Sequence, residues 1–139
     1  MYLAGGSGLA PIRALVEAAL AADPKRRLTV VFSARTEADV LDRERFAYLQ
    51  ATYSGFRFIR TLTRGKGPAP RGRIPARLSE LCGDLAGHEV FIAGVSGFVL
   101  GCVAAAQATG AEPAQIHTEV FFAEPQPRTG TARTAAEKQ

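Results

Sequence analysis

A glycine-rich segment near the amino end carries the clearest chemical signal in the sequence. Residues 5–11 read Gly-Gly-Ser-Gly-Leu-Ala-Pro and stand between a short apolar run and a helical pattern. Because glycine has no Cβ, such a turn lets a phosphate approach backbone N–H groups at the positive end of the following helix. Pro11 suits the first helical turn. The pattern predicts a phosphate-binding turn, and an ordinary tight turn between strand and helix is the alternative.

Two common phosphate-binding fingerprints do not fit this segment. The dinucleotide fingerprint G-x-G-x-x-G places a third glycine where Pro11 stands, and it expects an acidic residue after the second strand, where the sequence has Ser33-Ala34-Arg35. A P-loop requires Gly-Lys-Ser/Thr, which does not follow either. An ordinary Rossmann dehydrogenase and a P-loop nucleotidase are both disfavoured. Two interpretations of Arg35 are equally consistent with its position: a charged surface residue, or a contact on the adenine side of a bound nucleotide.

Positive charge is concentrated in residues 56–81, whereas the rest of the chain is slightly acidic. The segment has seven basic residues and one acid, Glu80, within a chain of net charge +4. The basic residues are Arg57, Arg60, Arg64, Lys66, Arg71, Arg73 and Arg77. A confined excess of this kind suits a small anionic ligand better than nucleic acid, which would call for interleaved exposed aromatics or a recognition helix. A solvated basic loop is the alternative.

The cysteines and histidines form no recognisable metal or disulfide pattern. Cys82 and Cys102 cannot build a disulfide framework, and His88 and His117 complete no ligand set for zinc or an iron–sulfur cluster. We expect Cys102 to be a core residue and His117 a satisfied histidine in a sheet. The apolar opening, residues 1–22, contains glycines and charges and no basic leader. These features predict a cytoplasmic protein that does not enter a membrane.

Apolar runs alternate with helical patterns along the chain. Strands are expected at residues 1–4, 28–32, 56–62, 89–93 and 116–122, and helices over 12–20, 41–52, 74–81 and 99–106. This order predicts parallel crossovers and an α/β fold, a doubly wound five-stranded parallel sheet with helices on both faces. The length of 139 residues suits one core. We expect one domain over residues 1–123 and a flexible tail over residues 124–139.

Ligands of such sheets bind beyond the carboxyl ends of the strands. Three turns should meet there, one over residues 5–8, one at Thr63-Arg64-Gly65, and one over residues 94–97. Together with neighbouring blocks, they resemble the NAD(P)-binding domain of the ferredoxin–NADP reductase superfamily, particularly flavin-dependent reductases that feed oxygenases and iron–sulfur partners. The resemblance covers residues 1 to about 122. Its blocks are LAGGSGLAP at 3–11, FSARTEADV at 32–40, LTR at 62–64, VFIAG at 90–94 and IHTEVF at 116–121.

The resemblance implies a role for each block. The first would hold the pyrophosphate, the Thr63-Arg64 pair would lie near the adenosine ribose or its 2′-phosphate, and the fourth would face the nicotinamide. The implied cofactor-binding residues are Gly5, Gly6, Ser7, Gly8, Pro11, Ala34, Arg35, Thr63, Arg64, Ala93, Gly94, Val95 and Phe98. Glu119 and Phe121 would be catalytic, where nicotinamide meets flavin; without the resemblance, their alternation predicts only a solvent-facing pair on an edge strand.

Two departures from the family pattern shape the functional hypothesis. The usual Cys-Gly-Pro is Ala93-Gly94-Val95 here, which removes a thiol. The family pattern also leads us to expect a flavin-binding barrel with an Arg-x-Tyr-Ser/Thr motif ahead of this domain, and residues 1–139 do not include it. The implied function is to position NAD(P)H for hydride transfer to FAD on a separate domain or partner. The electrons would then pass from the flavin to a ferredoxin- or oxygenase-type acceptor. This chain alone would be inactive.

Two alternatives to the reductase hypothesis remain. One is a non-catalytic NAD(P)-binding or regulatory module, and the other is a structural subunit. The sequence leaves open the final electron acceptor, the oligomeric state, and whether the chain is a fragment or a complete subunit. It also leaves open whether the nucleotide is NADH or NADPH. We slightly prefer NADH, because Arg71 and Arg73 follow a Pro-containing stretch, residues 68–70, and the sequence does not define whether their side chains reach a 2′-phosphate.

Overall fold

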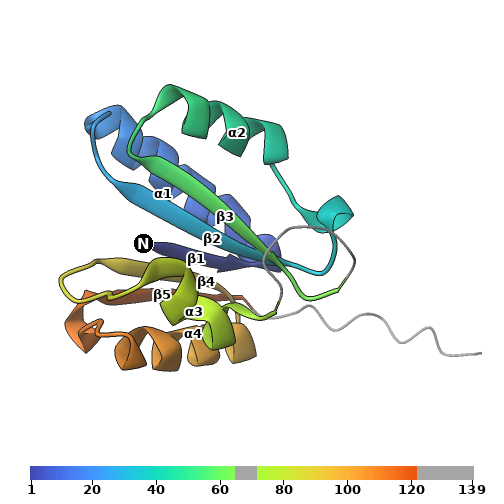
Figure 1. Cartoon of the computed structure of the whole chain (residues 1–139), viewed down its shortest axis with the longest axis vertical. Helices are drawn as coiled ribbons and strands as arrows, with labels where there is room; N and C mark the ends of the chain where they lie inside the picture. Colours follow the sequence, from blue (N-terminus) through green and yellow to red (C-terminus); the bar gives the residue numbers. More distant parts are fainter. Residues whose placement is uncertain (65–71, 122–139) are drawn as a thin grey trace, which may run out of the picture.

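Five parallel strands form the centre of the molecule, in the spatial order β3-β2-β1-β4-β5 (Figure 1). The computed structural model describes residues 1–64 and 72–121. The strands are β1 (Tyr2–Gly5), β2 (Leu28–Ala34), β3 (Phe56–Leu62), β4 (Val90–Val95) and β5 (Ile116–Phe121). The expected doubly wound parallel sheet is confirmed. The chain order reverses direction between β1 and β4, which is where such sheets leave a crevice.

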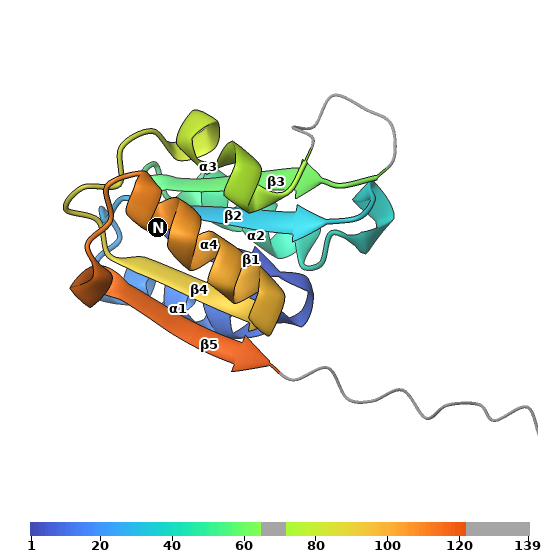
Figure 2. The same cartoon turned by 90° about the horizontal axis from the view of Figure 1, so that it is seen from below.

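Helices cover both faces of the sheet. Helices α1 (Leu9–Ala22) and α2 (Arg43–Thr52) lie on one face, and α3 (Ile74–Cys82) and α4 (Ser96–Ala108) lie on the other (Figure 2). Three short 3-10 turns complete the described part: η1 (Gly6–Gly8), η2 (Glu37–Asp39) and η3 (Pro113–Gln115). Helix α1 illustrates why the elements dock, because Ile12, Val16 and Leu20 recur at helical spacing and are buried.

The strands supply two cores, one on each side of the sheet. In β2, Val30 and Phe32 face the α1–α2 side, whereas Val31 faces the α3–α4 side. A strand covered on both faces needs apolar residues at consecutive positions, which explains the unbroken apolar run in β2. Cys102 of α4 is fully buried in the second core, as expected, and burial raises the pKa of its thiol to about 12.

The structure differs from the sequence-based expectation at two boundaries. Strand β4 continues to Val95 and α4 begins at Ser96, so the predicted separate turn over residues 94–97 is wrong. The reason is a packing contact, since the ring of Phe98 lies against Gly94 and lets strand and helix follow directly. Helix α2 begins at Arg43 rather than Leu41, after Asp42 in the left-handed region (φ 53°).

Several expectations concern residues outside the described part. Residues 65–71 include Gly65, Lys66 and Arg71, and residues 122–139 include the tail. The division into a domain over 1–123 and a tail over 124–139 therefore stays a prediction. Among the described residues, no helix combines the length and the apolar character needed to cross a bilayer.

Candidate functional site

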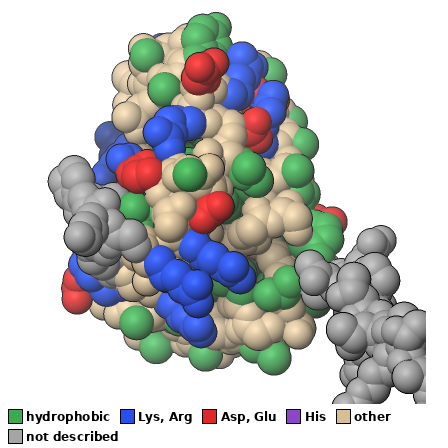
Figure 3. All heavy atoms as spheres, turned by 90° about the vertical axis from the view of Figure 1, so that its right-hand side faces the viewer, with side chains coloured by type: hydrophobic (Ala, Val, Ile, Leu, Met, Phe, Trp, Pro, Cys, Tyr) green, Lys and Arg blue, Asp and Glu red, His purple; other side chains and the backbone are tan. Residues whose placement is uncertain are grey.

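A cleft of about 680 Å³ opens at the carboxyl ends of the strands. Eight of the residues singled out in the sequence line it: Gly5, Gly6, Ser7, Ala34, Arg35, Thr63, Val95 and Phe98. The volume is in the range of small-molecule sites. Figure 3 looks onto this edge, where Lys and Arg side chains gather toward the middle and left of the face and apolar side chains border it below. Residues far apart in the sequence thus meet in one cleft.

The middle of the cleft is exposed backbone. Gly6 has a φ of +54°, and a Cβ built on Gly6 or on Gly97 would meet no other atom within 4 Å. Both glycines lie at the beginning of a helical segment, Gly6 ahead of α1 and Gly97 in the first turn of α4, and no side chain caps either helix. Free N–H groups at two helix N-termini favour an anion between them.

Three other glycines have a packing role. A Cβ on Gly8 would lie 2.2 Å from the carbonyl oxygen of Ala93, so Gly8 allows η1 to approach β4. A Cβ on Gly5 or Gly94 would lie 3.0 or 2.6 Å from the Phe98 ring. Gly8 and Gly94 do not line the cleft. Of the five glycines, Gly6 and Gly97 are the ones that leave open space beside the backbone.

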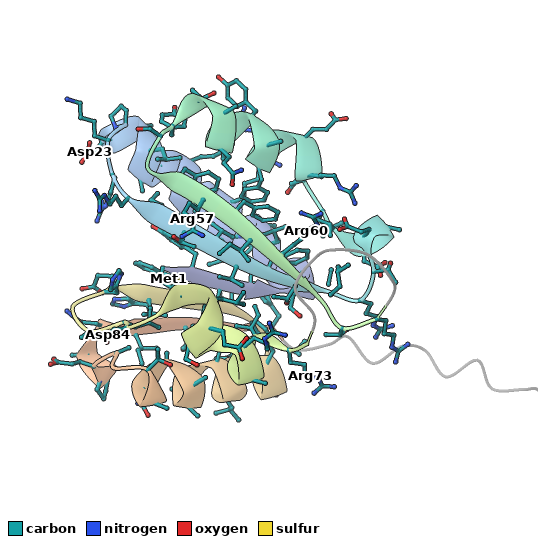
Figure 4. All side chains as sticks on the ribbon, viewed as in Figure 1. Met1, Asp23, Arg57, Arg60, Arg73 and Asp84 are labelled. Atoms are coloured by element: carbon teal, nitrogen blue, oxygen red, sulfur yellow. The ribbon has the colours of Figure 1, made fainter. Side chains whose placement is uncertain are left out.

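One end of the cleft is rich in arginine. The backbone pairing of β2 with β3 continues past both strands, because Thr63 N donates to Ala34 O (2.9 Å) and Arg64 N to Arg35 O (2.7 Å). Arg35 and Arg73 line the cleft, and Figure 4 shows Arg73 at this edge, opposite Met1 (Figure 4). Within residues 1–64 and 72–121, the structure pairs none of these three arginines with a carboxylate.

Other arginines of the described part do have acidic partners. Arg13 pairs with Asp42 (2.9 Å) and Arg60 with Glu37 (2.6 Å). One described acid, Asp39, lines the cleft, and its Oδ2 accepts hydrogen bonds from the backbone N and Oγ1 of Thr36. The uncompensated positive charge at this end suits a phosphate group.

Seven predicted site residues are not part of the cleft lining: Gly8 and Gly94, already described, and Pro11, Arg64, Ala93, Glu119 and Phe121. Glu119 is exposed and Phe121 half-buried on the edge strand β5. Phe121 lies beside Val95 in the pairing of β4 with β5, and Val95 does line the cleft. The structure therefore places Phe121 next to the rim, and the catalytic roles of Glu119 and Phe121 stay predictions.

Seven lining residues were missing from the predicted set: Phe32, Ser33, Asp39, Leu41, Arg73, Pro75 and Gly97. Parallel topology was a usable signal for some of them. A helix that follows a parallel strand begins at the carboxyl edge, which would have indicated Arg73 and Pro75 at the start of α3 and Gly97 at the start of α4. No such signal existed for Asp39 and Leu41, since they lie in and just after an irregular 3-10 turn.

Neither cysteine lines the cleft. Cys82 ends α3 at the opposite edge, with its Sγ 3.7 Å from Sδ of Met1, and burial raises the pKa of its thiol. His117 is likewise remote: its Nε2 lies 2.7 Å from Glu89 Oε2, and its ring stacks on Phe91, which makes it the satisfied sheet histidine that was expected. The chemistry of the described cleft is therefore binding chemistry, without a nucleophilic thiol.

Residues 2–103 match the family model of the oxidoreductase NAD-binding domain. The chain belongs to this family. The match includes the glycine segment, the Arg35 region, the Thr63-Arg64 pair and the first half of α4. The resemblance to the NAD(P)-binding domain of ferredoxin–NADP reductases is confirmed.

Curated relatives of this NAD-binding domain are reductases. The chain is 32% identical over 122 residues to the reductase subunit of an aromatic O-demethylase from an Amycolatopsis species, covering 87% of this chain and 36% of that protein. It is 33% identical over 108 residues to ferredoxin–NADP reductase B of Sorangium cellulosum, covering 71% of this chain and 44% of that protein. The chain thus spans less than half the length of either relative.

A solved structure agrees with this assignment. The crystal structure of a cytochrome P450 reductase from Amycolatopsis superposes with a TM-score of 0.82 at 30% identity. The superposed part is 86% of this chain and 36% of that reductase. The NAD-binding domain is therefore similar in both sequence and fold to one portion of a larger reductase.

Proposed function

We propose that this NAD-binding domain holds NAD(P)H in the cleft and positions it for hydride transfer to a flavin on a separate domain or partner. The observation that carries the proposal is the cleft itself. Its middle is open backbone at Gly6 and Gly97, near two helix N-termini that no side chain caps, and at its β2–β3 end Arg35 and Arg73 pair with no carboxylate among residues 1–64 and 72–121. A dinucleotide needs such a pyrophosphate cradle between two differently shaped ends.

The residues present fit such a ligand. In this proposal the pyrophosphate lies over Gly6 and Gly97, the adenosine end lies among Arg35, Thr63 and Arg73, and the nicotinamide end lies near Val95 and Phe98. The bound nicotinamide supplies the hydride chemistry, and the protein supplies binding and orientation. The Phe98 ring forms an apolar part of the cleft wall and keeps water from that side.

The flavin side of the site is proposed to come from elsewhere. Val95 and Val120 are exposed at the ends of β4 and β5, and Glu119 is exposed beside them. We propose that an FAD-binding domain or subunit covers this region and that Glu119 and Phe121 lie where it meets the nicotinamide. The names of the relatives, a reductase subunit of an O-demethylase and a ferredoxin–NADP reductase, support an oxygenase or ferredoxin as the onward acceptor.

Calorimetric titration and steady-state assays test the proposal together. We expect the chain to bind NADH or NADPH weakly, because a cleft that normally closes against a second domain is open on one side. We also expect negligible reduction of ferricyanide, since no flavin is present. Absence of binding to either nucleotide, or rapid turnover without flavin, would contradict the proposal.

A non-catalytic NAD(P)-binding module is the second candidate, and Ala93 in place of the family cysteine favours it. A chimera separates the two. Joining the flavin-binding portion of the Amycolatopsis O-demethylase reductase subunit to this chain should give NAD(P)H-dependent ferricyanide reduction if the domain is catalytic. Binding of NAD(P)H without turnover, in a chimera that retains FAD, would support the module.

A further inference from the structure

The connection between β2 and α2, residues 35–42, forms a wall of the cleft. Arg35, Asp39 and Leu41 line the cleft from this segment. The backbone of Arg35 is paired with that of Arg64, and Val40 is buried in the core below. Between these two anchors lies Glu37, at the start of η2, whose side chain points to the outer side of the segment rather than into the cleft.

Glu37 joins this wall to two other elements. Its Oε1 accepts a hydrogen bond from Nε of Arg60 on β3 (2.6 Å), and its Oε2 lies 3.2 Å from Nη2 of Arg43 at the start of α2. Nη2 of Arg43 also donates to the backbone oxygen of Glu37. Figure 4 shows Arg60 on β3 directly beside the η2 segment. We call Glu37, Arg43 and Arg60 the Glu37 clasp.

Apolar packing does not hold the wall on this side. A hollow of about 190 Å³ lies between the segment, α2 and β3, and it is lined by the three clasp residues together with Phe46, Ala47, Gln50 and Phe58. The Phe46 and Phe58 rings stack on each other at 4.5 Å. Among the described residues, the side-chain contacts that join Glu37 to α2 and β3 across this hollow are the ion pairs of the clasp, so these pairs help to position residues 36–38.

We propose that Glu37 is a positioning residue for the adenosine end of the cleft, acting through the wall formed by residues 35–42. This inference rests on the proposed function, because it takes the ligand of that end to be the adenosine part of NAD(P)H. The clasp ion pairs are partly exposed, and such pairs add little to global stability. Their loss should therefore appear as local disorder of the wall and weaker adenosine binding, with little change in melting temperature.

The test compares Glu37→Gln with a matched control, Glu17→Gln. Glu17 also contacts two arginines, Arg13 and Arg45, and its side chain is 30% exposed against 35% for Glu37, but it links α1 to α2 away from the cleft. Hydrogen exchange of residues 35–42 is measured without ligand, and affinity is measured with ADP and with NADPH. Glu37→Gln should speed the exchange and weaken both ligands about three- to tenfold, and Glu17→Gln should do neither.

A double-variant cycle adds a second readout. Arg60→Gln combined with Glu37→Gln should weaken ADP binding no further than Glu37→Gln alone, because Glu37→Gln already removes the contact with Arg60. Unchanged exchange in Glu37→Gln would overturn the clasp, and faster exchange with unchanged ADP affinity would overturn the positioning role. If the wild-type chain bound none of ADP, NADH and NADPH, the proposed function would fall and this role with it. That outcome is visible in the wild type alone.

Discussion

The two halves of the cleft rim differ in the side chains that they carry. On the β2–β3 half, residues 35–42 form a wall, and Arg35 and Arg73 line the space. On the β4–β5 half, the apolar side chains of Val95 and Val120 are 48% and 40% exposed. One half is rich in positive charge, and the other presents an apolar surface.

This difference indicates what each half requires. A phosphorylated adenosine needs fixed positive charge, which a single domain can supply with arginines and helix N-termini. Hydride transfer needs a second reactant held against the nicotinamide, and the apolar rim at Val95 and Val120 offers a surface for the protein that holds it. The comparison therefore supports a composite site, complete for binding and incomplete for turnover.

The largest expected effect lies where the halves meet, at the contact of η1 with β4. Gly8→Ala would place a Cβ 2.2 Å from the backbone oxygen of Ala93, and backbone cannot move aside cheaply. We expect a loss of about 3 kcal/mol in the free energy of unfolding, measured by urea denaturation. Gly97→Ala is the control, because its Cβ enters open space. A Gly8→Ala protein as stable as the wild type would contradict the packing role.

A nearly equal effect, on binding rather than stability, is expected at Gly6. In Gly6→Val the β-branched side chain would project into the cleft, so NADPH affinity should fall about a hundredfold or more. Gly83→Val is the matched control, because Gly83 also has a positive φ (+68°) and open space around it, at the other edge of the sheet. Both variants place a β-branched residue at a backbone position with positive φ. Equal NADPH affinity in the two would mean that Gly6 forms only a turn.

The charged half is tested by Arg64→Ala. Loss of a charge-assisted contact to a 2′-phosphate should weaken NADPH about ten- to a hundredfold and NADH less, measured by calorimetry at two salt concentrations. Arg57→Ala is the control, because Arg57 lies near the amino end of β3, the strand that Arg64 follows, and it should change neither affinity. Equal weakening of both nucleotides would assign Arg64 to the shared phosphates, and no weakening would leave it as a solvated charge.

The smallest effect is expected on the β4–β5 half. Val120→Ser should change the free energy of unfolding by less than about 0.5 kcal/mol and leave NADPH affinity unchanged, because Val120 is exposed and outside the cleft lining. Leu41→Ser replaces another exposed apolar residue, one that does line the cleft, and it should weaken the binding of NADPH. In the flavin chimera we expect the opposite ranking of the two variants for turnover: Val120→Ser should lower the turnover rate more than Leu41→Ser does.

Local pattern was sufficient to predict the fold. The period of apolar residues in α1 and the unbroken apolar run in β2 follow from burial on one face and on two faces. Alternation of strands and helices then left a doubly wound parallel sheet as the expected topology, which the structure confirms. The placement of Gly6, Arg35 and Thr63 at one edge followed from that topology, since parallel strands end together.

Only the tertiary structure could distinguish the roles of residues of the same type. Gly6 and Gly8 are alike in sequence, yet one faces open space and the other contacts β4. Arg60 and Arg64 belong to the same basic segment, yet Arg60 is paired with Glu37 while Arg64 has no acidic partner among the described residues. The sequence determined which residue types reach the carboxyl edge, because period and order are local. Which glycine is left open and which arginine is left unpaired depends on contacts between segments distant in the chain, and three-dimensional packing decides those.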